Sequence, residues 1–297
     1  MATAAQHYIE AFQRGEDFKS PAVGLTVDGK PDATAVQVLG EQLALANPSV
    51  REKIVRLLVD LGKRTDPLTP KGADVLRNPQ ILAVLAGPGL AKPDLGRQAA
   101  IDALRRFSLP ADLAGFGDAF AKALQEAPTE DCFLLVAKAK PPQARALIYR
   151  LAESPRWDKT EAAQVARAAL GDTKIEGEFL TRAKKAEAAS DGKALADAIA
   201  TLGLVGTQTS LKAVAERLRT PLTIELKGTY IKSVRLDVLE ALLYNFPDQP
   251  VLYPNNIVKE QDYLAAEQFC TQTLGVVYNT PEPPFLTYYG YPIPAPR

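Results

Sequence analysis

The chain has 297 residues, of which 46% are hydrophobic, and its 35 basic and 35 acidic residues give a formal net charge of zero. This apolar content suffices for a folded core, whereas the lack of a basic excess argues against a dedicated nucleic-acid-binding protein. No stretch approaches the roughly 18 consecutive apolar residues that a membrane-spanning helix needs.

The N-terminal region, residues 1–31, is expected to form a short helix and then a long loop. The loop contains a short extended piece at 23–27, and Asp28-Gly29 then marks a turn. The first residues, MATAAQHYIEAF, have neither the basic start nor the apolar centre of a secretory signal peptide. The default expectation is therefore a cytoplasmic protein, and the sequence leaves open a processed N-terminus, as in an organelle or the periplasm.

The most regular stretch is NPSVREKIVRLLVDLGKR, from Asn47 to Arg64. Asn47 is a favourable N-cap, and Pro48 occupies the first helical position, where its missing N–H costs nothing. One face carries apolar residues at helical spacing, namely Val50, Ile54, Leu57, Leu58 and Leu61. Together with a helix from Asp32 to about Ala46, this stretch predicts a helical hairpin.

The apolar pattern of this helix returns along the chain. Apolar residues stand three, six and seven positions after Arg51, and the same offsets recur after four later basic residues: Arg97, Arg145, Lys193 and Arg235. The starts are 46, 48, 48 and 42 residues apart. A period in the forties is typical of stacked helical hairpins.

These starts resemble the second helix of the HEAT-repeat family, over residues 32–275. Val50-Arg51 and Val234-Arg235 match the family's Val-Arg start, and Asp94 before Arg97 matches its aspartate, although Gly96 replaces the valine. The resemblance implies an all-α fold, an α-solenoid of HEAT-like helical hairpins. It also implies that the arginines pair with acidic or carbonyl groups of the next repeat in an internal ladder, formed by Arg51, Arg97, Arg145 and Arg235.

The resemblance further implies a non-catalytic scaffold for protein–protein interaction, or a structural subunit of a larger assembly. In such solenoids the second helices line a concave surface that binds protein partners. Polar and aromatic residues of those helices are the candidate contacts: Lys53, Arg56, Asp60, Arg105, Tyr149, Arg150 and Tyr244.

Several segments interrupt the regular pattern. Asn78-Pro79 predicts another helix start, and the stretch LTIELKGTY at 222–230 alternates apolar and polar residues, as a short extended insertion does. Further helices are expected at 111–126, 129–140, 159–170, 175–189, 210–219 and 256–274.

The C-terminal tail, 276–297, cannot be helical, because residues from Thr280 onward read TPEPPFLTYYGYPIPAPR. Prolines lower the entropy cost of holding an extended chain, and aromatic rings anchor interfaces. The tail is therefore predicted to lie along the C-terminal repeats or on a protein partner through Phe285, Tyr288, Tyr289 and Tyr291.

The sequence offers few residues for chemistry. It has one histidine, His7, and two well-separated cysteines, Cys132 and Cys270, which are expected to be buried free thiols. It has no glycine-rich phosphate-binding motif. We therefore expect no catalytic residues, no metal and no cofactor.

An enzyme remains the alternative. Arg156-Trp157-Asp158 contains the single tryptophan, and HEAT-like alkylpurine DNA glycosylases use Trp, Asp and Arg around an extruded nucleotide. Those enzymes draw the three residues from separate repeats of a basic protein, whereas here the residues are contiguous and the chain is neutral. Bilin lyases are a second HEAT-like enzyme class, supported here by fold analogy alone. In the plainer interpretation, Trp157 fills the junction between two hairpins.

Overall fold

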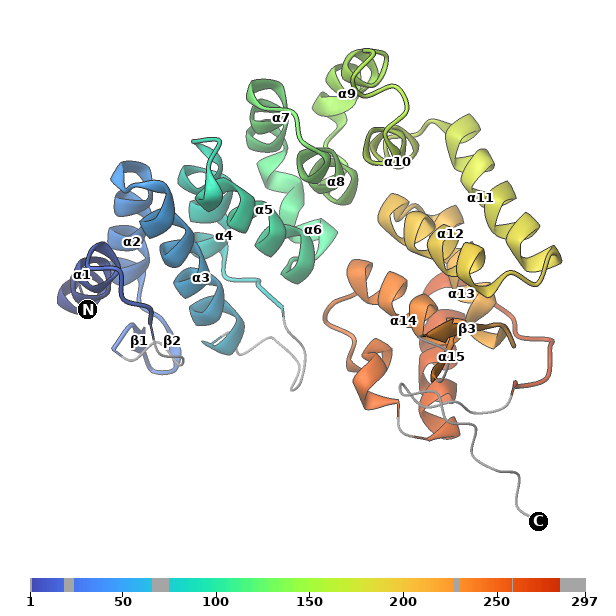
Figure 1. Cartoon of the computed structure of the whole chain (residues 1–297). Helices are drawn as coiled ribbons and strands as arrows, with labels where there is room; N and C mark the ends of the chain where they lie inside the picture. The colour runs from blue at the N-terminus through green and yellow to red at the C-terminus, as the bar shows by residue number, and fades with distance from the viewer. Residues whose placement is uncertain (1, 19–23, 66–74, 227–229, 258, 284–297) are drawn as a thin grey trace. The chain divides into compact units, whose positions relative to one another are not determined.

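The protein is mostly helical. The computed structural model describes residues 2–18, 24–65, 75–226, 230–257 and 259–283 (Figure 1), and it divides into two compact units, Met1–Ala163 and Gln164–Arg297. The tail residues Phe285, Tyr288, Tyr289 and Tyr291 lie outside the described residues. None of the helices in the described ranges is long and apolar enough to cross a membrane.

The first unit contains α1 to α9. Their bounds are α1 Ala2–Gln13, α2 Ala33–Leu45, α3 Pro48–Thr65, α4 Pro79–Ala86, α5 Leu95–Phe107, α6 Pro110–Leu113, α7 Gly117–Glu126, α8 Glu130–Ala139 and α9 Arg145–Ala152. In the described part of this unit, 3-10 turns lie at η1 Pro88–Leu90, η2 Ala114–Phe116 and η3 Pro142–Ala144. The boundary between the units falls within α10, Glu161–Ala169.

The second unit is also helical and contains a β-hairpin. Its helices are α11 Thr173–Ala188, α12 Gly192–Val205, α13 Gln208–Ala215, α14 Val234–Asn245 and α15 Glu260–Leu274, with 3-10 turns η4 Glu216–Arg219, η5 Pro250–Leu252 and η6 Pro254–Asn256. The hairpin pairs β3 Thr223–Leu226 with β4 Tyr230–Ser233 in antiparallel register, Thr223 opposite Ser233. The extended insertion expected at 222–230 contains β3 and the first residue of β4. The hairpin continues to Ser233, three residues beyond the expected end.

Helices begin where the sequence supplies capping side chains. Asp32, Asn78 and Thr129 each accept a hydrogen bond from a backbone N–H in the first turn of α2, α4 and α8. Asp172 and Asp191 do the same for α11 and α12. Each cap satisfies a donor that has no partner within its helix, and is worth about 1 kcal/mol.

Some boundaries differ from the prediction. The expected helix 111–126 is broken into α6, η2 and α7 around Gly115, and the expected helix 210–219 ends at Ala215 and continues as a 3-10 turn. The last helix begins at Glu260 rather than at 256, because Pro254 opens a separate short turn there. The early extended piece is a two-residue strand, β1 Thr26–Val27, paired with β2 Lys30–Pro31 across Asp28-Gly29, both with positive φ.

In the first unit, successive helices pack along the chain: α1 on α2, α2 on α3, α3 on α5 and α5 on α8. In the second unit α12 is central and packs on α11, α13 and α14. Gly203 permits the close approach of α12 to α14, since a Cβ atom there would lie 2.7 Å from the Cβ of Ala241. Leu58 and Leu104 are fully buried, and so are Leu202 and Leu239 in the second unit.

Candidate functional site

The α3–α5 pair is held together by a buried arginine. The Arg51 side chain has no exposed surface, and its Nη atoms donate hydrogen bonds to the carbonyl oxygens of Leu43, Pro88 and Gly89. Its Nε atom lies 2.8 Å from Oδ2 of Asp94, the N-cap residue of α5. Arg51 therefore joins the end of α2, the turn η1 and the start of α5.

Gly96 is a requirement of this contact. A Cβ atom at Gly96 would lie 2.6 Å from the Cβ of Arg51, so any side chain would push α5 away from α3. The glycine that departs from the Val-Arg pattern therefore has a packing role, and α5 begins directly against the Arg51 side chain.

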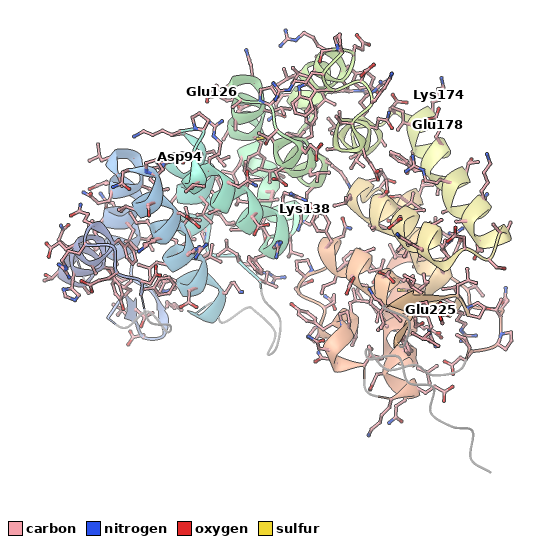
Figure 2. The ribbon with its side chains drawn as sticks, in the orientation of Figure 1. Asp94, Glu126, Lys138, Lys174, Glu178 and Glu225 are labelled. Atoms are coloured by element: carbon pink, nitrogen blue, oxygen red, sulfur yellow. The ribbon has the colours of Figure 1, made fainter. Side chains whose placement is uncertain are left out.

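Arg97 occupies the equivalent position in the first turn of α5, 46 residues after Arg51. It is nearly buried, its Nε donates to the carbonyl of Leu90 at 2.7 Å, and its Nη2 lies 3.0 Å from the carboxylate of Glu126 on α7. Figure 2 labels Asp94 and Glu126, the carboxylate partners of Arg51 and Arg97. The first turns of α3 and α5 thus each carry an arginine whose side chain turns into the interior.

In the second unit Arg235 is also buried. Its Nε donates to the carbonyl of Leu218 at 2.7 Å, its guanidinium lies 3.5 Å from the ring centroid of Tyr263, and Glu267 lies 4.0 Å away. Burial lowers the pKa of Arg235 and raises the pKa of Tyr263 to about 12. Arg145 differs from these arginines, because it is exposed and its guanidinium lies over the ring of Tyr149, 5.8 Å from the centroid.

Helices α3 and α5 run in the same direction, side by side (Figure 1). Their first turns meet at the Arg51–Asp94 ion pair, and their last turns meet where the Nζ of Lys63 lies 4.0 Å from the ring centroid of Phe107. A groove of about 590 Å³ runs between them. This volume lies within the range of ligand-binding clefts.

The groove combines an apolar centre with polar edges. Its apolar lining consists of Phe18, Val55, Val59, Leu95, Ala99, Ala103 and Phe107, and its polar lining of Glu52, Arg56, Asp60, Lys63, Gln98, Asp102 and Arg106. On each helix these positions follow steps of three and four residues, so they form one stripe. Leu95 is 57% exposed at the end of the groove where α5 begins.

The charges of the groove pair along their own helices. Arg56 lies 2.6 Å from Glu52 on α3, and Arg106 lies 2.7 Å from Asp102 on α5, both at i,i+4 spacing. The two arginines are 65% and 67% exposed, so these pairs are solvated and each contributes at most about 1 kcal/mol.

Of the predicted contact residues, Arg56 and Asp60 lie in the groove, and Lys53 and Arg105 do not. The amine of Lys53 donates to the carbonyls of Gly15 and Glu16, at 2.9 and 2.6 Å, and so fastens the N-terminal loop to α3. Arg105 forms an ion pair with Asp131 at the start of α8. Both are therefore engaged in internal contacts.

The remaining predicted contacts lie elsewhere. Tyr149 lines a shallow hollow beside η3 and α9 of about 450 Å³, Arg150 is exposed on α9, and Tyr244 is half-buried on α14. The other groove residues were not predicted as contacts: Phe18, Glu52, Val55, Val59, Lys63, Leu95, Gln98, Ala99, Asp102, Ala103, Arg106 and Phe107. Helical spacing places those of α3 on one face and those of α5 on another, but only the packing of the two helices joins the faces into a groove.

The residues weighed for chemistry are mostly internal. Trp157 is 8% exposed and its ring lies 5.1 Å from that of Phe133, which leaves little ring surface for a nucleotide to stack on. His7 is exposed on α1. Cys132 and Cys270 are buried free thiols, and burial raises the pKa of Cys270 to about 11. Among the described residues no group of three or more His, Cys, Asp or Glu side chains is placed to hold a metal ion.

Lys138 is a buried lysine of the first unit. Lys138, labelled in Figure 2, lies on α8 and is 1% exposed. Its amine donates a hydrogen bond to the carbonyl of Arg105 near the end of α5. Burial, together with the nearby charge of Arg105, lowers the pKa of Lys138 to about 7. Its position inside the α5–α8 contact gives it a packing role.

Comparison of the whole chain with protein-family models, with curated proteins and with solved structures finds no match.

Proposed function

We propose that the protein is a non-catalytic scaffold that binds a protein partner in the groove between α3 and α5. The observation that carries this proposal is the apolar stripe between two parallel helices, with Leu95 57% exposed at one end. A groove with an apolar floor and polar edges is typical of a binding site for another molecule.

We propose further that the helices are HEAT-like repeats of an α-solenoid. The support is that Arg51 and Arg97, which are 46 residues apart, each turn into the interior. Arg51 donates a hydrogen bond to the carbonyl of Leu43 in the last turn of α2, and Arg97 donates one to the carbonyl of Leu90 at the end of η1. The buried side chains of Arg51, Arg97 and Arg235 bond carbonyl oxygens inside the protein, as an internal ladder of arginines would. Arg145 is exposed and does not belong to such a ladder. A stack of such units presents its inner helices on one continuous surface.

The charges of the groove favour a protein partner over a nucleic acid. Three carboxylates and three cationic side chains line it, so it has no net charge to attract a polyanion. Its cations are also mostly paired with carboxylates of their own helix. A protein partner can combine apolar contact at the groove centre with polar contacts at its edges, which is the usual arrangement of a protein interface.

A crosslinking experiment tests the proposal. A photoreactive amino acid in place of Arg106 should crosslink a specific protein in an extract of the native source, and Ala99→Arg should abolish that crosslink by filling the groove. Ala83→Arg is the matched control, because Ala83 is exposed on α4 and lies outside the groove lining. If both variants crosslink equally, or if the parent protein does not crosslink, the groove is not the binding site.

A further inference from the structure

We propose that the partner segment is an amphipathic α-helix that lies antiparallel to α3 and α5, with acidic and basic residues alternating every four positions along its edges. This rests on the proposed function, since it specifies the partner of the same groove. The first of these acidic residues lies in the first turn of the partner helix, against Lys63 and Arg106.

The length and shape of the groove fit a short helix. Its lining on α3 runs from Glu52 to Lys63, eleven residue steps, or about 17 Å at 1.5 Å per residue. This is three helical turns. The small side chains of Ala99 and Ala103 on α5 leave room in the groove. A third helix can therefore pack there at the 8–10 Å spacing of helix pairs.

Backbone hydrogen bonding selects a helix over an extended peptide. The groove is formed by the flanks of two helices, whose own N–H and C=O groups are already paired. Its one amide side chain, Gln98, donates its Nε2 to Asp131 at 2.5 Å. An extended peptide would therefore bury backbone groups without partners, at a cost of about 1–3 kcal/mol each, whereas a helix satisfies them internally.

The charges lie in bands across the groove. The parallel register sets Lys63 beside Phe107, so Lys63 and Arg106 form a cationic band at the last turns. Asp60 and Asp102 form an acidic band about one turn earlier. Arg56 and then Glu52 continue the alternation along α3. The complementary partner carries Glu, Lys, Glu and Lys at intervals of about four residues.

The order of those charges sets the direction of the partner. An antiparallel helix begins at the cationic band, so its acidic residue stands in its first turn, where the positive end of the helix dipole favours it. Glutamate followed by lysine four residues later is also the more stable order within a helix. Exchanging the exposed Glu52–Arg56 and Asp102–Arg106 pairs for intermolecular pairs costs little, because such solvated pairs are weak.

Peptide binding tests the inference directly. The probe is a fluorescein-labelled peptide of about 16 residues, with leucine at i, i+3, i+4 and i+7, glutamate in the first turn and lysine four residues later, repeated once. One control exchanges every glutamate and lysine, and a second places two prolines in the centre to prevent a helix. We expect the probe to bind at least about tenfold more tightly than either control, a difference of about 1.4 kcal/mol.

A charge-exchanged protein provides the matched variant. Asp102→Arg combined with Arg106→Asp keeps the composition and the i,i+4 pair but reverses the charge order on α5. It should lose most of its preference for the probe and bind the charge-exchanged peptide more tightly than the parent does, with unchanged circular dichroism.

Equal binding of both charged peptides, or equal binding of the proline peptide, would overturn the inference. If a native partner still crosslinks in the groove, the inference that the partner is a helix is wrong, and the proposed function remains supported. If the groove variant Ala99→Arg has no effect on any partner, the proposed function fails as well.

Discussion

The Nε atom of Arg51 lies 2.8 Å from Oδ2 of Asp94, and neither α3 nor α5 can shift without separating them. Asp94 also accepts a hydrogen bond from the backbone N–H of Arg97 at 3.1 Å, so the carboxylate caps α5 and neutralises Arg51 at once. The α3–α5 groove is therefore built on an ion pair whose arginine is fully buried. Its geometry depends on that pair more than on the exposed charges along its edges.

Replacing Arg51 tests this dependence. Arg51→Met keeps the apolar stem but leaves Asp94 and the carbonyls of Leu43, Pro88 and Gly89 without their donor. Removing one partner of a buried pair costs about 3 kcal/mol or more, so urea unfolding of the first unit should shift by that amount. Arg56→Met, at a 65% exposed side chain, should change stability by no more than about 0.5 kcal/mol. Similar losses in both variants would show that Arg51 is an ordinary surface charge in solution.

The apolar faces provide a second test. Leu58→Asp or Leu104→Asp places a charge in the fully buried contact of α3 and α5 with their neighbours, which costs several kcal/mol. We expect loss of far-UV circular dichroism or a large fall in melting temperature for each. Leu45→Asp is the control, because Leu45 is 76% exposed at the end of α2. Near-normal melting of both core variants would contradict the helical phase assigned here.

The helical fold could be predicted from local signals. Asn47-Pro48, Asp32 and Asn78-Pro79 mark helix starts in the sequence, and each of them caps or opens a helix in the structure. The apolar stripe of α3 follows from its spacing, as Ile54, Leu57 and Leu58 are all buried. Such signals depend on residues within one or two turns, so one sequence suffices to read them.

The partners of long side chains could not be predicted in this way. The sequence predicts Lys53 and Arg105 as partner-binding surface residues. In the structure Lys53 donates to the carbonyls of Gly15 and Glu16, 38 and 37 residues earlier in the chain, and Arg105 donates to Asp131, 26 residues later. Those pairings depend on how helices pack, which the helical period does not specify. The same holds for the groove, since Leu95 and Phe107 belong to it only because α5 lies parallel to α3.

Lys138 makes the free energy of unfolding of the first unit depend on pH. Its pKa is lowered to about 7 in the folded protein, whereas a lysine in an unfolded chain titrates near about 10.4. Between about pH 7 and pH 10 the unfolded state therefore binds more protons, and the free energy of unfolding rises with pH through this window and is flat below it. The rise from this group is at most about 1.4 kcal/mol per pH unit.

Comparison of variants isolates that contribution. Urea unfolding between pH 7 and pH 9.5 should show wild type gaining stability relative to Lys138→Met as pH rises. Lys122→Met, at a 77% exposed side chain, should leave the pH profile of wild type unchanged. A constant difference between wild type and Lys138→Met across this range would mean that the amine keeps an ordinary pKa.

The last prediction concerns the C-terminal strap, Val276–Pro283. Val276 is 1% exposed, the hydroxyl of Tyr278 donates to the carbonyl of Ala215 at 3.0 Å, and Arg219 donates to the carbonyl of Thr280. Arg219 is itself held by Glu267 on α15, at 2.9 and 2.7 Å. The strap therefore fastens α13 and η4 to the end of the chain.

Two truncations separate the strap from the aromatic tail beyond it. A chain ending at Gly275 loses the strap and should unfold its second unit at a temperature at least about 4 °C lower, since burial of Val276 and the Tyr278 ring is worth about 2 kcal/mol. A chain ending at Pro283 keeps the strap and should melt like wild type, while losing any partner that Phe285, Tyr288, Tyr289 and Tyr291 hold. If the longer truncation leaves the melting temperature unchanged, the strap contributes no stability. If removal of Pro284–Arg297 changes neither melting nor assembly, the aromatic tail is a passive end of the chain and its predicted role as an attachment arm is wrong.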